Sequence, residues 1–208
     1  MSLMDRDQAV ALRELLMATS AEPDWVAASA EFGLAVQAAP KAAGGLLVAG
    51  PAEAEPWHFT AHLADEAQWA RLPHLSPTLL RADPAGDAPA HLAVGWERLT
   101  QSGRGEALLV VAEVDPQDEL LERIDVARRR GTRILALAQT APELKGIAHE
   151  TLLVPAPVRA QPPGPLTFDT AQHLVSLATT AQSGRRAGLR TRLARWQDRI
   201  NGPTVETW

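Results

Sequence analysis

The sequence predicts an α/β fold, a three-layer sandwich in which a five-stranded parallel sheet of flavodoxin type has helices flanking both faces. Residues 105–139 hold two short apolar runs separated by a segment with apolar residues on one face of a helix. Strand, helix and strand over about 30 residues form a βαβ unit, which links parallel strands by a right-handed crossover. Three further apolar runs alternate with helical patterns around this unit, as in a sheet covered on both sides.

Two amphipathic helices are predicted before the first strand, over residues 5–18 and 20–38. Ser20 is a suitable N-cap for the second helix, and Pro23 stands in its first turn. The first strand is expected at Gly44–Gly50, because a continuously apolar run is typical of a strand buried on both faces. The elements predicted next are a helix at 56–71, a strand at 77–81, a loop at 82–88 and a helix at 89–101.

The central unit is predicted as a strand at 107–112, an acidic loop at 113–117, a helix ending near Arg130 and a strand at 134–138. Gly131 stands where a helix C-terminal cap favours glycine, and the arginines before it suit the carbonyl end of the helix. The elements predicted after it are a short helix at 142–148, a strand at 150–154, a proline-rich loop at 155–165 and a helix at 171–181 capped by Asp169 or Thr170.

The chain is expected to form one domain over residues 1–183, including the helices at 5–38, followed by a basic helix and tail over 184–208. The segment 185–200 carries six arginines together with Leu189, Leu193, Trp196 and Ile200, which is the pattern of a basic amphipathic helix. The simplest interpretation is that it packs on the chain's own acidic domain. An acidic partner or an anionic lipid surface is the alternative.

The composition excludes several classes of protein. With 46% hydrophobic and 22% charged residues among 208, the chain is globular in composition, and a net charge of -5 gives no electrostatic case for nucleic acid. Because the chain has no cysteine, disulfides, thiolate metal sites and a cysteine nucleophile are excluded. No apolar run has the length of a membrane span, and the first ten residues lack the apolar core of a signal peptide, so we expect a cytoplasmic protein.

The order of elements resembles the SIS (sugar isomerase) domain, a fold that binds phosphosugars. The resemblance lies in GGLLVAG with its following loop and helix, in GEALLVVAEVDPQDELLERIDVARRRGTRILALAQ, and in ELKGIAHETLLVPA. Within that family, GGLLVAGPAEAEPWHFTAHLAD is most similar to the phosphoheptose isomerase branch and to SIS-like relatives of unknown function. The resemblance spans residues 21–181 and implies a homodimer or a larger homo-oligomer, with the two N-terminal helices as the interface.

In a parallel sheet the ligand crevice lies beyond the carboxyl ends of the strands, which directs attention to the loops at 50–56, 82–88, 113–117 and 139–142. The resemblance implies a ligand site in the first and third of these loops. Where the family has glycine, serine and threonine, this chain has carboxylates, and like charges repel a phosphate. The candidate ligand-binding residues are Gly50, Ala52, Glu53, Glu55, Glu113, Asp115 and Gln117.

The acidic residues of these loops, Glu53, Glu55, Glu113 and Asp115, have two interpretations. A carboxylate pair can act as general acid and base. Alternatively, acidic groups at helix N-termini complement the dipole, and Asp115-Pro116 reads as an N-cap followed by proline at the first helical position. The second interpretation is the simpler one. A dinucleotide-binding G-x-G-x-x-G and a Ser-His-Asp arrangement are both absent from the sequence.

His58 and His62 are four residues apart on one predicted helix, so both rings can meet the same metal ion. In the phosphoheptose isomerases the equivalent helix supplies zinc ligands, and the resemblance implies Gln172 as a further ligand from the last helix. The family's remaining ligand would fall near Thr180, which is not a metal ligand. Zinc is the natural ion for imidazole. A pair of surface histidines, or a polar contact within a dimer interface, is the alternative.

Three functions follow as hypotheses. The first is an SIS-like protein that has lost catalysis and binds a small ligand of the sugar-phosphate kind or serves as a regulatory or assembly module. The second is a sugar-phosphate isomerase of the phosphoheptose type with an altered, zinc-dependent site. The third is a partner-binding protein that uses the basic C-terminal helix.

Overall fold

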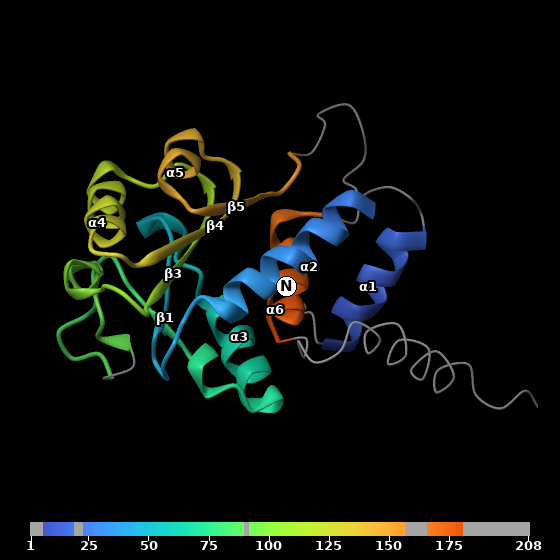
Figure 1. Cartoon of the computed structure of the whole chain (residues 1–208), viewed down its shortest axis with the longest axis horizontal. Helices are drawn as coiled ribbons and strands as arrows, with labels where there is room; N and C mark the ends of the chain where they lie inside the picture. The colour runs from blue at the N-terminus through green and yellow to red at the C-terminus, as the bar shows by residue number, and fades with distance from the viewer. Residues whose placement is uncertain (1–5, 19–22, 90–91, 157–165, 181–208) are drawn as a thin grey trace, which may run out of the picture.

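The protein forms a five-stranded, all-parallel sheet with strand order β2-β1-β3-β4-β5 (Figure 1). The computed structural model describes residues 6–18, 23–89, 92–156 and 166–180. The strands are β1 (Leu46–Ala49), β2 (Pro77–Leu79), β3 (Ala107–Val114), β4 (Arg133–Thr140) and β5 (Glu150–Leu153). This order is that of the flavodoxin-type doubly wound sheet, so the predicted fold class is confirmed.

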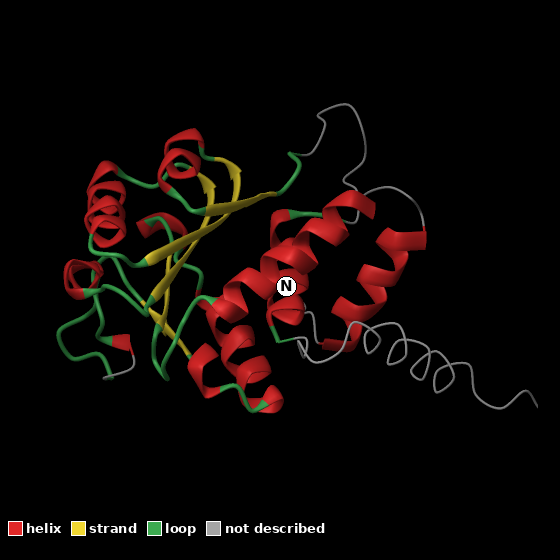
Figure 2. Cartoon of the chain, in the orientation of Figure 1, coloured by secondary structure: helices red, strands yellow, loops and turns green. Residues whose placement is uncertain are grey.

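Helices cover both faces of the sheet (Figure 2). The described α-helices are α1 (Arg6–Ala18), α2 (Pro23–Ala38), α3 (Trp57–Ala70), α4 (Asp118–Arg129), α5 (Pro142–Ile147) and α6 (Phe168–Thr179). Three short 3₁₀ segments also belong to the described residues: η1 (Ala52–Ala54), η2 (Pro73–Leu75) and η4 (Trp96–Gln101). Residues of α2, α3 and α6 share a buried cluster with one face of the sheet, and residues of α4, α5 and η4 share one with the other face. Helix α1 packs on α2 and α6, away from the sheet (Figure 1).

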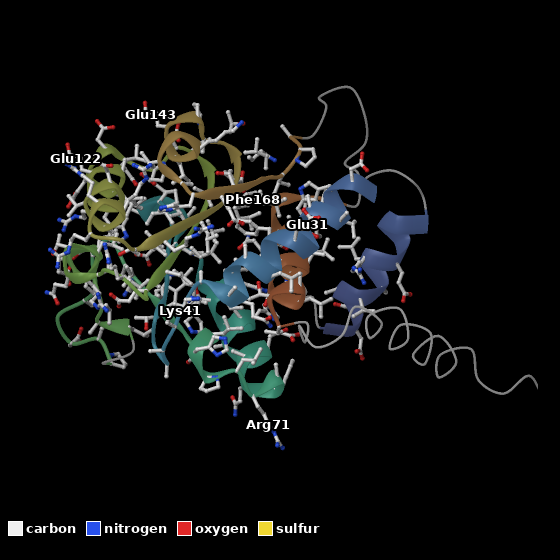
Figure 3. All side chains as sticks on the ribbon, in the orientation of Figure 1. Glu31, Lys41, Arg71, Glu122, Glu143 and Phe168 are labelled. Atoms are coloured by element: carbon white, nitrogen blue, oxygen red, sulfur yellow. The ribbon has the colours of Figure 1, made fainter. Side chains whose placement is uncertain are left out.

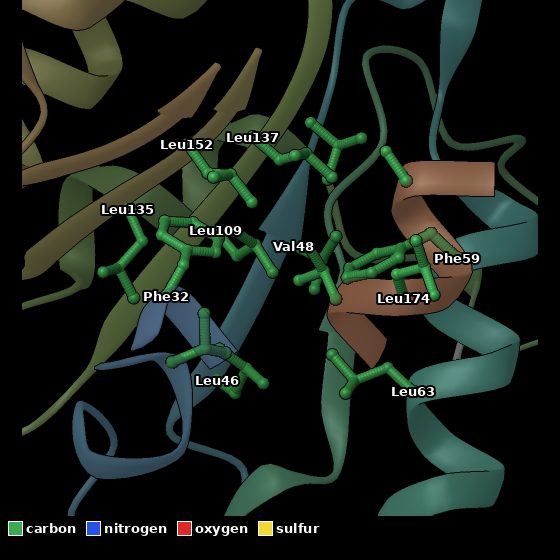
Figure 4. Close-up of a cluster of buried hydrophobic side chains, with 14 of the residues drawn as sticks. Phe32, Leu46, Val48, Phe59, Leu63, Leu109, Leu135, Leu137, Leu152 and Leu174 are labelled. Atoms are coloured by element: carbon green, nitrogen blue, oxygen red, sulfur yellow. The ribbon is translucent and has the colours of Figure 1, made fainter. Parts of the chain in front are cut away.

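Successive side chains of a strand point to opposite faces of the sheet, and here both faces are buried in the core. In β1, Leu46 and Val48 enter the cluster under α3 and α6, whereas Leu47 and Ala49 enter the opposite one. In the first cluster Val48 lies close to aromatic and aliphatic side chains of α3 and α6 (Figure 4). Charged side chains such as Glu122 on α4 and Glu143 on α5 lie on the outer surface (Figure 3). This core holds α3 and α6 side by side at the carboxyl end of β1.

The prediction of a helix at 89–101 is wrong over most of that range. Over the described residues 93–101, the helical piece is the 3₁₀ segment η4 (Trp96–Gln101), and the residues just before it run alongside the end of β2. There the Arg81 amide donates to the carbonyl of Val94 at 2.9 Å, and the Trp96 amide donates to the carbonyl of Arg81 at 2.9 Å. Since these backbone groups are paired with β2, they are not available for an α-helix.

Several boundaries also differ from the prediction. Strand β3 continues to Val114, because that residue still pairs with Thr140 of β4. The N-cap of α6 is Thr167, whose hydroxyl accepts the Thr170 amide at 3.2 Å, and not Asp169 or Thr170. The predicted cap at Gly131 is confirmed by its φ of 99°. The predicted N-cap Ser20 and the basic helix at 185–200 lie outside the described residues.

Candidate functional site

A hollow of about 190 Å³ lies at the carboxyl ends of β1 and β3, between the first turns of α3 and α6. It is lined by Ala54, Glu55, Pro56, Trp57, His58, Val111, Ala112, Glu113, Phe168, Asp169 and Gln172. Two of the four loops expected to form a crevice, those at 50–56 and 113–117, contribute to this lining. The loops at 82–88 and 139–142 do not. The position agrees with the rule that ligands of such sheets bind beyond the carboxyl ends of the strands.

Glu55 fixes the loop after β1 to the end of β2. Its carboxylate accepts the Ala82 amide at 2.9 Å and the Arg81 Nε–H at 3.1 Å, and its side chain is only 9% exposed. The indole N–H of Trp57 also donates to it, at 2.9 Å. Three donors therefore satisfy this carboxylate, and the cation of Arg81 offsets its charge.

Replacing Glu55 with alanine is expected to lower the free energy of unfolding by about 1 to 2 kcal/mol, because the Ala82 amide and the Arg81 guanidinium would lose their acceptor. Glu53→Ala is the matched control: Glu53 is exposed, and we expect its loss to change stability by less than about 0.5 kcal/mol. Urea unfolding of the two variants measures both values. Equal stabilities would show that Glu55 does not hold the loop in place.

The remaining loop residues also contact one another. Gln117 bridges the two loops: its amide nitrogen donates to Glu53 at 2.7 Å, and its amide oxygen accepts the Ala52 N–H at 3.4 Å. Gly50 is buried, and an added Cβ would lie 2.8 Å from both Pro56 Cδ and the Val111 carbonyl oxygen. Gly50 thus permits the close approach of the loop to β3 and offers no side chain to a ligand.

Asp115 does not cap the helix that follows it in sequence. Helix α4 begins at Asp118 with Gln117 as its N-cap, and the carboxylate of Asp115 instead accepts the amides of Glu143 at 3.2 Å and Leu144 at 2.9 Å. It therefore serves the N-terminus of α5, where an anion is favoured. Glu113 is the candidate acidic loop residue that is exposed and also lines the hollow.

Beside the hollow, three imidazoles form a cluster: His58 and His62 of α3 and His173 of α6. Their ligand atoms all lie within 4.8 Å of one another. The Nε2 atoms of His58 and His62 are 2.8 Å apart, and the ring of His173 meets both other rings edge-on, with centroids at 5.1 and 4.5 Å. A tetrahedral zinc ion holds nitrogen ligands at roughly 2.0–2.1 Å, so small side-chain rotations are enough to bring these three nitrogens onto one ion.

Burial favours the neutral, metal-binding form of two of these rings. The pKa of His173 is lowered to about 4, first by desolvation and then by the neighbouring His62, against the raising effect of Asp169. The pKa of His62 is also lowered, first by desolvation and then by His58, against the raising effect of Asp65 and Asp169. Neutral imidazole is the ligand form for zinc, and the two nearby aspartates favour a cation.

No family model and no curated protein matches the chain. Among solved structures, it is similar to a protein described as sugar binding from Salmonella typhimurium LT2, with 18% identity, a TM-score of 0.49, and coverage of 94% of this chain and 54% of that one. It is also similar to the sugar isomerase domain of the RpiR transcription factor from Sphaerobacter thermophilus, with 14% identity, a TM-score of 0.47, and coverage of 85% and 87%. A third structure is the Vibrio vulnificus NanR protein complexed with ManNAc-6P, with 16% identity, a TM-score of 0.38, and coverage of 84% and 63%.

The strand order and the helix layers are those of a flavodoxin-type α/β fold, in agreement with the SIS-like fold expected from the sequence. The phosphoheptose isomerase branch stays a prediction. The chain spans about half the length of the Salmonella protein, 54% of it. At identities and TM-scores this low, nothing about ligand or activity follows from these likenesses.

The histidine cluster differs from the set of metal ligands predicted from the sequence, His58, His62 and Gln172. Gln172 lines the hollow, and its amide lies 3.5 Å from the carbonyl of Phe168 one turn earlier. The neighbouring His173, which the sequence analysis missed, completes the cluster with His58 and His62. Thr180 donates to the buried carboxylate of Glu66 at 2.9 Å, two turns along α6 from His173. None of the described helices is long and apolar enough to cross a membrane.

Proposed function

We propose that this chain is a ligand-binding module of SIS-like fold, in which a divalent metal ion held by His58, His62 and His173 helps to bind a small sugar-like ligand in the hollow. The observation that carries the proposal is the three-histidine cluster beside the hollow, with ligand atoms within 4.8 Å of one another. His58 belongs both to the cluster and to the lining of the hollow, so a ligand bound there would lie next to the metal.

The chemistry of the donors favours zinc. Imidazole nitrogens suit zinc and copper better than magnesium or calcium, and three protein ligands leave a position for an oxygen of the ligand. The residues of this chain supply the rest: Asp65 and Asp169 favour the cation electrostatically, and burial keeps His173 unprotonated.

The loop contacts support binding more than catalysis. Glu55, Glu53 and Asp115 are all occupied with other parts of the chain, by Arg81, by Gln117 and by α5. A zinc-dependent isomerase is the second candidate, favoured by Glu113, whose carboxylate lines the same hollow as His58 and is a suitable general base. Turnover of an aldose phosphate by the zinc-loaded protein, lost in Glu113→Gln, would favour this second candidate. Assembly as a homodimer stays a prediction.

Titration of the metal-free protein with zinc chloride in a calorimeter tests the metal site. We expect one zinc ion per chain, and a loss of affinity of about a hundredfold or more in His173→Ala and in the His58→Ala, His62→Ala double variant, since each removes direct ligands. His74→Ala is the control, because His74 lies on η2, outside the cluster. In thermal denaturation, zinc at about a hundred times its dissociation constant should stabilise the wild type by about 2.7 kcal/mol.

Two results would contradict the metal site. One is the absence of zinc binding by the wild type near pH 7. The other is unchanged zinc affinity in His173→Ala, which would leave only the pair on α3 and remove the role assigned to α6.

A further inference from the structure

We propose that the ligand of the hollow is an uncharged sugar ring of monosaccharide size, stacked with its apolar C–H face on Trp57. The inference rests on the proposed function, because it names the ligand class of the same hollow. It departs from the phosphosugars that the family resemblance implies.

Trp57 is held in place at the edge of the hollow. It is the first residue of α3, lines the hollow and is 39% exposed. Its indole N–H donates to Glu55 at 2.9 Å, and the guanidinium of Arg81 lies 4.6 Å from the ring centroid. Arg81 covers one part of the ring and is not among the residues that line the hollow. The remaining ring surface is a fixed apolar platform, and an aromatic ring fixed in advance loses little entropy when a ligand stacks on it.

The charges around the hollow oppose a phosphate. Glu55, Glu113 and Asp169 are among its lining residues, and in the described part of the chain no lysine or arginine lines it. Arg81, which lies over the ring of Trp57, is paired with Glu55 at 3.1 Å. Phosphates are ordinarily held by arginine or lysine, and a dianion would meet like charges here. A metal dication on the histidines would be balanced by Glu113 and Asp169, which leaves no excess positive charge for a phosphate.

The same residues suit hydroxyl groups. Carboxylates accept hydrogen bonds from sugar hydroxyls, and the amide of Gln172 both donates and accepts. Phe168, the first residue of α6, adds a second aromatic side chain to the lining. Aromatic walls with a few convergent polar groups are the usual composition of a small-molecule site.

The size of the hollow suits a ligand of one ring. Its volume of about 190 Å³ is below the roughly 300–1,000 Å³ of sites for drug-sized ligands. A disaccharide or a nucleotide would extend well beyond the hollow, whereas a single hexose or pentose ring would have one face on Trp57 and its hydroxyls toward the acidic residues.

Calorimetry of the zinc-loaded protein with paired sugars tests the inference. The probes are glucose, galactose, mannose, N-acetylglucosamine and ribose, each compared with its own 6-phosphate or, for ribose, 5-phosphate. We expect at least one free sugar to bind about tenfold or more tightly than its phosphate. Trp57→Ala should weaken that binding at least about tenfold, as loss of a stacked aromatic does. Trp57→Phe, which keeps a smaller ring, should weaken it less.

Trp69→Ala is the matched control. Trp69 is on the same helix and is 64% exposed, but it does not line the hollow, so its loss should leave sugar affinity unchanged. Zinc affinity, measured in parallel, should be unchanged in both tryptophan variants, which shows that the fold and the metal site are intact.

The other possible results distinguish a failure of the sugar inference from a failure of the proposed function. Tighter binding of a phosphosugar, or zinc binding with no response to any sugar, would overturn the inference and leave the metal site standing. Equal loss in Trp57→Ala and Trp69→Ala would overturn the stacking role. If neither zinc nor any sugar binds, the proposed function fails together with the inference.

Discussion

Acidification from pH 6.5 to pH 4 is expected to lower the unfolding free energy of the metal-free protein by about 3 kcal/mol through His173 alone. The ordinary pKa of a histidine is 6.5, and burial lowers that of His173 to about 4 in the folded protein. Between these two values the unfolded chain binds a proton on this residue and the folded chain does not. The proton therefore stabilises the unfolded state, and stability falls as the pH falls.

The cause of this effect is the packing of α6. His173 is 5% exposed, so a charged ring there would lose its hydration, and the nearby His62 would repel it. Asp169, one turn earlier on the same helix, compensates only in part. The pKa of His62 is lowered as well, so its contribution to the pH dependence has the same sign.

Urea unfolding at intervals from pH 4 to pH 7 in the presence of a chelator measures the prediction. Carboxylates and other histidines also titrate in this range, so the comparison is between wild type and His173→Gln, which keeps a polar side chain of similar size but cannot be protonated. The variant should lose less stability on acidification, by about 3 kcal/mol. His74→Gln, on η2 outside the cluster, is the control for replacing a histidine with glutamine. Parallel curves for wild type and His173→Gln would show that His173 titrates normally in the folded protein.

The sheet could be predicted because its strands are short, continuously apolar and separated by helical patterns. Helix α4 was equally clear, with buried Leu120, Leu121, Ile124 and Ala127 on one face and Gly131 at its end. The failure at residues 89–101 has a tertiary cause. Trp96 and Leu99 are three residues apart, as on one face of a helix. The backbone just before and at Trp96, however, bonds to Arg81 after β2, and a pattern confined to neighbouring residues cannot reveal such a partner.

The site was predicted in part. The spacing of His58 and His62 was sufficient to place two rings together, but the third ligand depends on which face of α6 meets α3. Because α6 packs against α1, α2 and α3, it is buried on several sides, and its aliphatic residues do not mark one face. A weaker signal was present: His173, Ser176 and Thr180 form a polar stripe at helical spacing, as do His58, His62 and Glu66 on α3.

The roles of the acidic loops could not be predicted, because their partners are distant in sequence. Asp115 bonds to amides 28 and 29 residues later, and Glu55 to groups 26 and 27 residues later. A sequence shows that a carboxylate follows a strand but not which helix or loop the fold places against it. The interpretation of these residues as complements to helix N-termini holds for Asp115, although the helix is α5 and not α4.

Replacing Gly33 with alanine is expected to destabilise the protein by about 3 kcal/mol, near the upper end of the cost of overpacking a core. Gly33 is buried on α2, and an added Cβ would lie 2.6 Å from the carbonyl carbon and the Cβ of Ala178 and 2.8 Å from the Thr179 amide nitrogen. Two of these atoms belong to the backbone of α6, so no side-chain rotation relieves the contact, and the helices must move apart. That shift would also break the bond from the Gln37 amide to the Thr179 carbonyl, now 3.0 Å.

Gly146→Ala is the matched control for Gly33→Ala. Gly146 lies on the exposed side of α5, where an added Cβ meets no atom within 4 Å. Alanine is the better helix former, so this variant should be up to about 1 kcal/mol more stable than the wild type. Because α6 carries His173, Gly33→Ala should also weaken zinc binding, whereas Gly146→Ala should not. Wild-type stability and zinc affinity in Gly33→Ala would show that α2 does not press α6 toward α3, and the positioning of His173 would then need another cause.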